Sequence, residues 1–288
     1  MAEGSAARTG IGSATGSGIG LHTGTPVRVR LRRNAPGAGI SFVRTDLPGS
    51  PAIPADLNHV VAGRRCTSLR EPRSGATVKT VEHFLAAAFA LAARDLVLEV
   101  DGPELPAGDG SARWWVELIR QAGLEGVDLP GAFLDADVIV TDDSSPGTFI
   151  AAYPAPVFSA TYVFVPPYAG EAALLAEYVH QEGGASREYF VAELAPARTP
   201  AFVDEVASLQ REGLGLGGTI DQVALLGREG PANRWRFPDE PARHKLVDLL
   251  GDLSLAGPLR ARIVAVRTGH RHNLELARRL WPHLGARS

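Results

Sequence analysis

Residues 79–100 read KTVEHFLAAAFALAARDLVLEV, a stretch that predicts a buried helix followed directly by a strand. Thr80 is the expected N-cap of the helix, and the Ala, Leu and Phe residues after it favour burial. Residues 95–100 are rich in aliphatic side chains and predict the strand. After the turn DGPELPAGDGS, the segment ARWWVELIRQAGL (112–124) predicts a second helix.

The same order of elements recurs in the second half of the chain. A helix is expected over EPARHKLVDLLGDLSL (240–255), a strand over ARIVAVRT (261–268) and a helix over NLELARRLWPHL (273–284). The repeat predicts an α+β protein with two domains of related topology, residues 1–128 and 129–288. A site between two such halves would draw residues from both.

Composition excludes several classes of protein. The 288 residues include one cysteine, so neither an internal disulfide nor a thiolate-rich metal site is available. The net charge of −3 argues against a nucleic-acid partner. The N-terminus lacks the apolar segment of a signal peptide, and the longest apolar helical run, 84–93, is about half the roughly 20 residues that span a bilayer. We therefore expect a cytoplasmic protein without membrane insertion.

Any metal must be bound by His, Asp or Glu, and one helix offers a suitable pair. His244 and Asp248 are spaced i, i+4, which places both side chains on one helical face. With His83 they form a set of nitrogen and oxygen donors suited to zinc, or to iron, with one position open for water. A simple His–Asp surface pair remains the alternative.

Further polar residues fit the chemistry that an activated water needs. Glu82 precedes His83, so its carboxylate is a candidate general base. His270 follows the second-half strand, in a loop where Gly269 permits an irregular turn, and is a candidate acid or oxyanion partner. Asp252 lies one turn beyond Asp248 and is positioned to orient His270.

The N-terminal stretch GSGIGLHTG lacks the Lys-Ser/Thr of a phosphate-binding loop. It is interpreted as a hairpin turn that leads into the strand 25–33. In that strand Val27, Val29 and Leu31 alternate with arginines, which would face solvent or a ligand.

Five segments, in this order, closely resemble the UDP-3-O-acyl-N-acetylglucosamine deacetylase family, zinc amidases of lipid A biosynthesis. The resemblance spans nearly the whole chain. The segments are TGSGIGLHTGTPVRVRL (15–31), KTVEHFLAAAFALAARDLVLEVDGPELPAGDGSA (79–112), ARTPAFVDEVASLQREGLGLGGTIDQ (197–222), FPDEPARHKLVDLLGDLSLAG (237–257) and TGHRHN (268–273).

The resemblance implies a β-α-α-β sandwich with the active site at the domain junction. It also implies that His83, His244 and Asp248 bind zinc, that Glu82 is the general base, and that His270 is the cationic acid or electrostatic stabiliser. The implied reaction is attack of zinc-activated water on the acetamide, which releases acetate.

Other roles also follow from the resemblance. Asp252 matches the partner of the cationic histidine, and Thr199 matches a threonine that polarises the amide carbonyl. Lys245 matches a basic residue near the nucleotide-sugar phosphates. Phe202 is expected to line the substrate site, and residues 203–226 match an insertion that forms a hydrophobic acyl passage.

Some positions depart from the family pattern. Residues 199–202 read Thr-Pro-Ala-Phe where Thr-Phe-Gly-Phe is typical, and Arg271 and His272 replace small or apolar residues. Residues that bind uridine cannot be placed. The departures leave two alternatives open, a same-family amidase acting on a different acylated amino sugar and a non-catalytic metal- and sugar-binding homologue.

Overall fold

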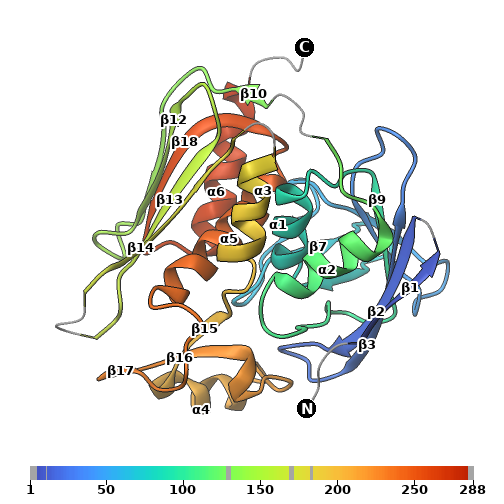
Figure 1. The fold of residues 1–288 in the computed structure, drawn as a ribbon, viewed down its shortest axis with the longest axis horizontal. Coiled ribbons are helices and arrows are strands. Elements are labelled where there is room, and N and C mark those ends of the chain that lie inside the picture. Colours follow the sequence, from blue (N-terminus) through green and yellow to red (C-terminus); the bar gives the residue numbers. More distant parts are fainter. Residues whose placement is uncertain (1–4, 11, 128–130, 169–171, 182–183, 285–288) are drawn as a thin grey trace.

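The protein is a four-layer sandwich in which helices lie between two sheets (Figure 1). The structure is a computed structural model and describes residues 5–10, 12–127, 131–168, 172–181 and 184–284. The layer order of sheet, helices, helices and sheet confirms the predicted α+β sandwich.

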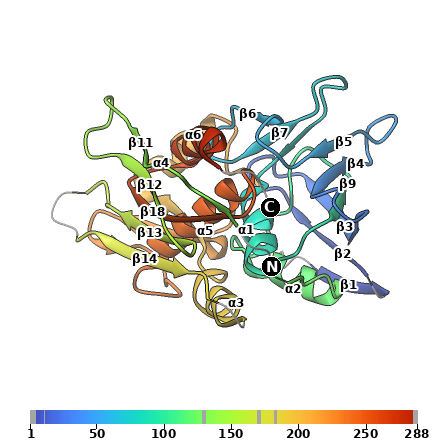
Figure 2. The same ribbon diagram turned by 90° about the horizontal axis from the view of Figure 1, so that it is seen from above.

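Each outer layer is a sheet built mainly from one half of the chain (Figure 2). The first sheet has the order β1 (Ser5–Gly10), β2 (Ser13–Ile19), β3 (Pro26–Arg33), β9 (Leu96–Val100), β4 (Ser41–Arg44) and β5 (Ala52–Pro54). The second has the order β11 (Val138–Thr141), β12 (Phe149–Pro154), β18 (Leu259–Val266), β13 (Ser159–Phe164) and β14 (Leu174–Val179), with β10 (Ala132–Phe133) also paired to β18.

Two small sheets lie beside the sandwich. They are β6 (Val60–Val61), β7 (Ser68–Arg70) and β8 (Thr77–Lys79), and β15 (Thr199–Phe202), β16 (Val223–Gly227) and β17 (Gly230–Pro231). The α-helices are α1 (Glu82–Ala90), α2 (Arg113–Ala122), α3 (Ala185–Tyr189), α4 (Val203–Arg211), α5 (Glu240–Ser254) and α6 (His270–Leu280). Short helical turns are η2 (Phe190–Leu194), η3 (Ile220–Gln222) and η4 (Trp281–His283).

The alternation of apolar and charged residues in β3 explains which face of the first sheet packs on the core. Val27, Val29 and Leu31 of β3 are buried, while Arg28 and Arg30 between them are exposed. Strands β2 and β3 pair as antiparallel neighbours, which confirms the predicted hairpin.

Helices α1 and α5 pack against each other at the centre and connect the two halves. Their contact requires Gly251, because a Cβ at that position would lie 2.1 Å from the backbone oxygen of Glu82. Glycine costs a helix roughly 1 kcal/mol relative to alanine, so this close approach explains its place in the middle of α5.

Gly251→Ala is therefore expected to push α5 away from α1. We expect the free energy of unfolding to fall by about 1–3 kcal/mol, as for other overpacked cores. Thermal unfolding with and without added zinc measures the change, and the gain in Tm on adding zinc should shrink. A variant as stable as the parent or more stable, as helix propensity alone predicts, would contradict this role.

The start of α1 differs from its predicted position. Val81, not Thr80, is the N-cap residue, and it makes no capping hydrogen bond through its side chain. Thr80 has a positive φ of 60°, and its hydroxyl instead donates to Glu104 at 2.9 Å. Capping by Thr80 was therefore wrong, because a buried carboxylate 24 residues away binds its hydroxyl.

In the second half, α5, β18 and α6 confirm the repeated helix–strand–helix order. However, His270 is the first residue of α6 and does not lie in a loop. Gly269 is extended, with φ −141°, and the left-handed residue at this turn is Arg267, so the predicted role of Gly269 was wrong. The predicted domain boundary between residues 128 and 129 lies outside the described part of the chain, and it stays a prediction.

Over the described residues, none of the helices has the length and apolar character needed to cross a membrane.

Candidate metal centre and active site

Three potential ligand atoms converge between α1 and α5. His83 Nε2 lies 3.2 Å from His244 Nε2, and Asp248 Oδ1 lies 3.4 Å from the first and 3.3 Å from the second. All three residues are buried. The structure therefore brings together the three residues that the sequence predicted as metal ligands.

The three atoms fit a tetrahedral ion. Bonds of about 2.0–2.1 Å place the ligand atoms of a tetrahedral site about 3.3–3.4 Å apart. Asp248 Oδ1 is buried and has no hydrogen-bond partner, which an ion would supply. His244 Nδ1 lies 2.9 Å from the Ala197 carbonyl and donates to it, which leaves Nε2 free to bind a metal.

The protonation states also suit a metal centre. Burial lowers the pKa of His83 and so favours the neutral imidazole that binds metals. Burial opposes ionisation of Asp248, but the Lys245 ammonium 2.6 Å from Oδ2 helps to hold the pKa of that carboxyl well below its usual range. His83 is thus a neutral imidazole and Asp248 a carboxylate, the forms in which these groups bind a metal.

Glu82 lies beside this centre and is almost completely buried. Its Oε2 accepts a hydrogen bond from the Thr67 backbone N–H at 3.0 Å, and its Oε1 lies 3.8 Å from His270 Nε2. Burial raises the pKa of Glu82 to about 8, and a bound cation would lower it. A carboxyl group with its pKa near neutrality is suited to take up and release a proton.

His270 faces the same space from the start of α6. Its Nδ1 lies 2.8 Å from Asp252 Oδ2, and its Nε2 lies 3.8 Å from Asp248 Oδ2. Burial alone would lower the pKa of His270, but the carboxylates of Asp252, Asp248 and Glu82 outweigh it and raise the pKa to about 9. The ring is therefore cationic at neutral pH and points Nε2 at the site.

Asp252→Asn tests this arrangement. Loss of the carboxylate lowers the pKa of His270, so the alkaline limb of kcat/KM for acetate release should move to lower pH, by about one unit. Asp142→Asn is the matched control, because Asp142 accepts from His272 and Arg271, not from His270. An alkaline limb that stays in place in Asp252→Asn would contradict the pairing.

Two residues that support the site have no signal in the sequence. The Thr67 hydroxyl donates to Asp252 Oδ1 at 2.5 Å, and Asn273 Nδ2 donates to Asp252 Oδ2 at 2.9 Å. Both side chains are completely buried, so Asp252 accepts hydrogen bonds on both oxygens. Only tertiary packing brings the residue that precedes β7 together with α5 and α6 around this carboxylate.

The remaining predicted residues lie on α5 and β15. Lys245 is ion-paired with the ligand Asp248, and that carboxylate outweighs burial and raises the pKa of the ammonium. Thr199 and Phe202 begin and end β15, the edge strand of its small sheet. Pro200 fits there, since the residue before proline favours extended backbone and edge strands tolerate a missing N–H.

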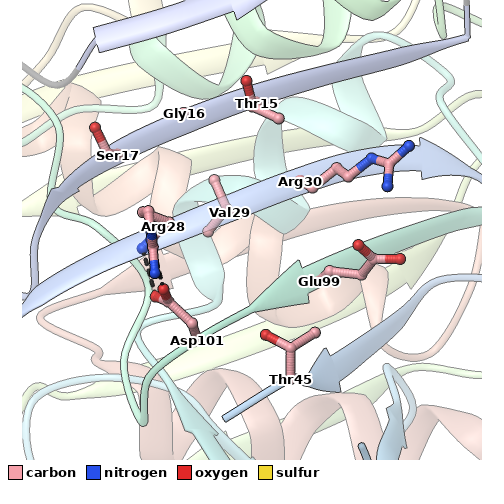
Figure 3. A pocket seen from close by; sticks show the side chains of 9 residues that line it. All are labelled: Thr15, Gly16, Ser17, Arg28, Val29, Arg30, Thr45, Glu99 and Asp101. Carbon is pink, nitrogen blue, oxygen red and sulfur yellow. Dashed lines mark hydrogen bonds and ion pairs between the residues drawn. The ribbon is translucent and has the colours of Figure 1, made fainter. Parts of the chain in front are cut away.

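Two other polar features are not part of the candidate ligand set. A hollow of about 360 Å³ lies on the first sheet, where Arg28 pairs with Asp101 at 2.8 Å (Figure 3). Arg30 also lines it. Cys66 is buried and is not among the candidate ligands, and burial raises the pKa of its thiol to about 11.

A buried centre of two histidines and one aspartate, with a carboxylate and a cationic imidazole facing it, defines a metal-dependent hydrolase. The chain belongs to the UDP-3-O-acyl N-acetylglycosamine deacetylase (LpxC) family, whose sequence profile matches residues 8–282.

Curated relatives match over most of their length. The chain is 39% identical over 251 residues to the UDP-3-O-acyl-N-acetylglucosamine deacetylase of Synechocystis sp., covering 85% of this chain and 88% of the relative. Identity is 37% to the Thermosynechococcus vestitus protein of the same name, with 88% and 86% covered. It is 36% to that of Chlamydia muridarum, with 88% and 87% covered.

Proposed function

We propose that this chain hydrolyses the N-acetyl group of UDP-3-O-acyl-N-acetylglucosamine in lipid A biosynthesis. The names of its relatives support the substrate. The observation that carries the reaction is the position of Glu82 and His270, whose facing atoms are 3.8 Å apart beside the three candidate ligands. A structural metal site would not need an acid and a base next to it.

Zinc is the proposed metal, bound by His83, His244 and Asp248. When bound, it would supply a Lewis acid for the amide carbonyl and lower the pKa of water to near neutrality. Iron(II) is the alternative, because nitrogen and oxygen ligands also accept it. Metal analysis of protein purified without chelators or added metal, followed by reconstitution with each ion, distinguishes the two.

Different side chains around this centre carry out the different proton transfers. Glu82 removes a proton from the attacking water. His270, held as a cation by Asp252, stabilises the oxyanion, and the Thr199 hydroxyl is proposed to donate to the same oxygen. Glu82 or His270 then protonates the leaving nitrogen, which gives acetate and a free amino sugar.

Substrate binding is proposed to involve the edge of the site. Lys245 would lie near the phosphates, Phe202 would line the sugar and acyl groups, and residues 203–226 would form the acyl passage. The partner is thus a nucleotide-linked acylated amino sugar, without nucleic acid or stable membrane insertion. A cytoplasmic location is proposed together with this substrate.

An assay of acetate release from UDP-3-O-acyl-N-acetylglucosamine by zinc-loaded protein tests the proposal. A same-family amidase on another acylated sugar is the second candidate, motivated by Pro200 and Ala201 beside Thr199. It predicts weak turnover of this substrate and faster turnover of an acylated amino sugar with a different carrier. No turnover of any such sugar, with metal bound, would favour the non-catalytic homologue.

A further inference from the structure

Glu104 is a buried carboxylate that takes no part in the proposed reaction, with only 1% of its surface exposed. It accepts hydrogen bonds from the backbone N–H groups of His22 at 2.9 Å and Thr23 at 2.8 Å. The hydroxyls of Thr23 and Thr80 also donate to it, at 2.8 and 2.9 Å. Four neutral donors from two separate segments therefore stabilise one buried charge.

The first of these segments is the turn between β2 and β3, residues 20–25. Gly20 is required there, since a Cβ would lie 2.6 Å from Glu104 Oε2 and 2.5 Å from Thr23 Oγ1. The turn is thus built around the carboxylate, and its backbone position depends on that group.

Two backbone carbonyls of the same turn accept hydrogen bonds from the second half of the chain. Leu21 O accepts from the Gly217 N–H at 3.0 Å, and His22 O accepts from the Leu216 N–H at 3.4 Å. A Cβ on Gly217 would lie 2.3 Å from the Gly20 carbonyl oxygen, so the two segments meet backbone to backbone. Gly217 lies in the connection from α4 to β16.

Helix α4 packs against β15 and β16 of its own half, and its side chains do little to hold it against the first half of the chain. It has no buried residue, and Val203 at its start is 44% exposed. Two ion pairs, Arg65 with Glu205 and Arg64 with Glu212, join it to the first half of the chain. All four side chains are at least 42% exposed, and exposed pairs contribute little. The backbone contacts at the turn are the more specific connection.

We propose that Glu104 is a positioning residue for the substrate's acyl chain. By fixing residues 20–25, it holds the α4–β16 connection, and with it the segment 203–226, against the first half of the chain. The acyl role of that segment rests on the proposed function, whereas the coupling between Glu104 and α4 does not.

Two variants act on the two sides of this contact. Glu104→Gln replaces two acceptor oxygens with one and turns an amide NH₂ toward donors. Gly217→Ala leaves Glu104 intact and forces the segments apart from the other side. Gly227→Ala is the matched control, since it is in the adjacent strand β16 and its Cβ would meet nothing closer than 3.5 Å.

Hydrogen exchange of the full chain and steady-state kinetics are the two measurements. In Glu104→Gln and Gly217→Ala, the amides of α4 should exchange about tenfold faster, with α1 and α5 unchanged. KM for the 3-O-acylated substrate should rise about tenfold, while kcat, zinc content and KM for a substrate without the acyl chain stay near the parent values. Gly227→Ala should match the parent throughout.

Exchange in α4 that is no faster in Gly217→Ala than in Gly227→Ala would overturn the coupling, even if Glu104→Gln failed to fold. Faster exchange with an unchanged KM for the acylated substrate would overturn the role in acyl positioning. If the parent protein turned over no acylated sugar, the proposed function would fail, and the exchange measurement would still decide the coupling.

Discussion

Glu82→Gln should lower turnover of the acetylated substrate by about 10²–10⁴-fold, the usual contribution of a general base. Glutamine has the size of glutamate, and its side-chain oxygen can still accept the hydrogen bond that Thr67 N–H donates at 3.0 Å. It cannot accept a proton from water. The variant should therefore fold, bind zinc and bind substrate with KM near that of the parent, so that the loss falls on kcat.

The measurement is acetate release at saturating substrate, with zinc content determined on the same samples. Glu99→Gln is the control, because Glu99 lies on β9 and pairs with Arg32, on the sheet face that carries the arginines. Its kcat should stay within about twofold of the parent. A Glu82→Gln enzyme that retained a tenth of parental turnover, or that lost its zinc, would exclude Glu82 as the base.

The ligand set was predictable because its spacing is local. His244 and Asp248 are one helical turn apart, so any α-helix over residues 240–255 places them together. Asp252 follows by the same periodicity, and its contact with His270 at 2.8 Å was expected. The approach of His83 to this helix was not determined by spacing, and it depends on the packing of α1 against α5.

What the sequence did not reveal depends on tertiary contacts. Thr67, just before β7, and Asn273 of α6 bind Asp252, and no local pattern marks either residue. Similarly, the position of Thr80 directly before a helix predicted an N-cap, and this prediction was wrong. The Thr80 hydroxyl instead donates a hydrogen bond to Glu104, which is 24 residues away in the sequence. Local rules fail at these positions because a buried carboxylate gathers donors from distant segments.

The departures at Arg271 and His272 have a structural explanation that does not involve the site. Both side chains pair with Asp142, in the turn between β11 and β12, with His272 Nε2 2.9 Å from its carboxylate. Hydrogen bonds from Ser144 and His272 hold the pKa of Asp142 below its usual range. The polarity that these residues add is thus directed away from His270 and stabilises the start of α6.

His83→Ala should abolish stoichiometric zinc binding and, with it, activity. The site has three candidate protein ligands, and removing one leaves two donors on a single helix turn, His244 and Asp248. Loss of an outer hydrogen-bond partner of a ligand already costs about 10–100-fold in metal affinity, so loss of a ligand should cost more. The substitution also removes one of the two imidazoles whose Nε2 atoms lie within 3.4 Å of Asp248 Oδ1.

Zinc titration monitored by thermal unfolding provides the measurement, since a ligand that binds only the folded state raises Tm by an amount that grows with the logarithm of its concentration relative to Kd. The parent Tm should rise with micromolar zinc, and that of His83→Ala should not. His59→Ala is the control, because His59 pairs with Asp56 at 2.7 Å and is not among the candidate ligands. A zinc-dependent Tm in His83→Ala equal to the parent's would place the metal elsewhere. It would also leave unexplained why Asp248 Oδ1 is buried without a donor, since that orphaned oxygen is stable only if a cation completes the centre.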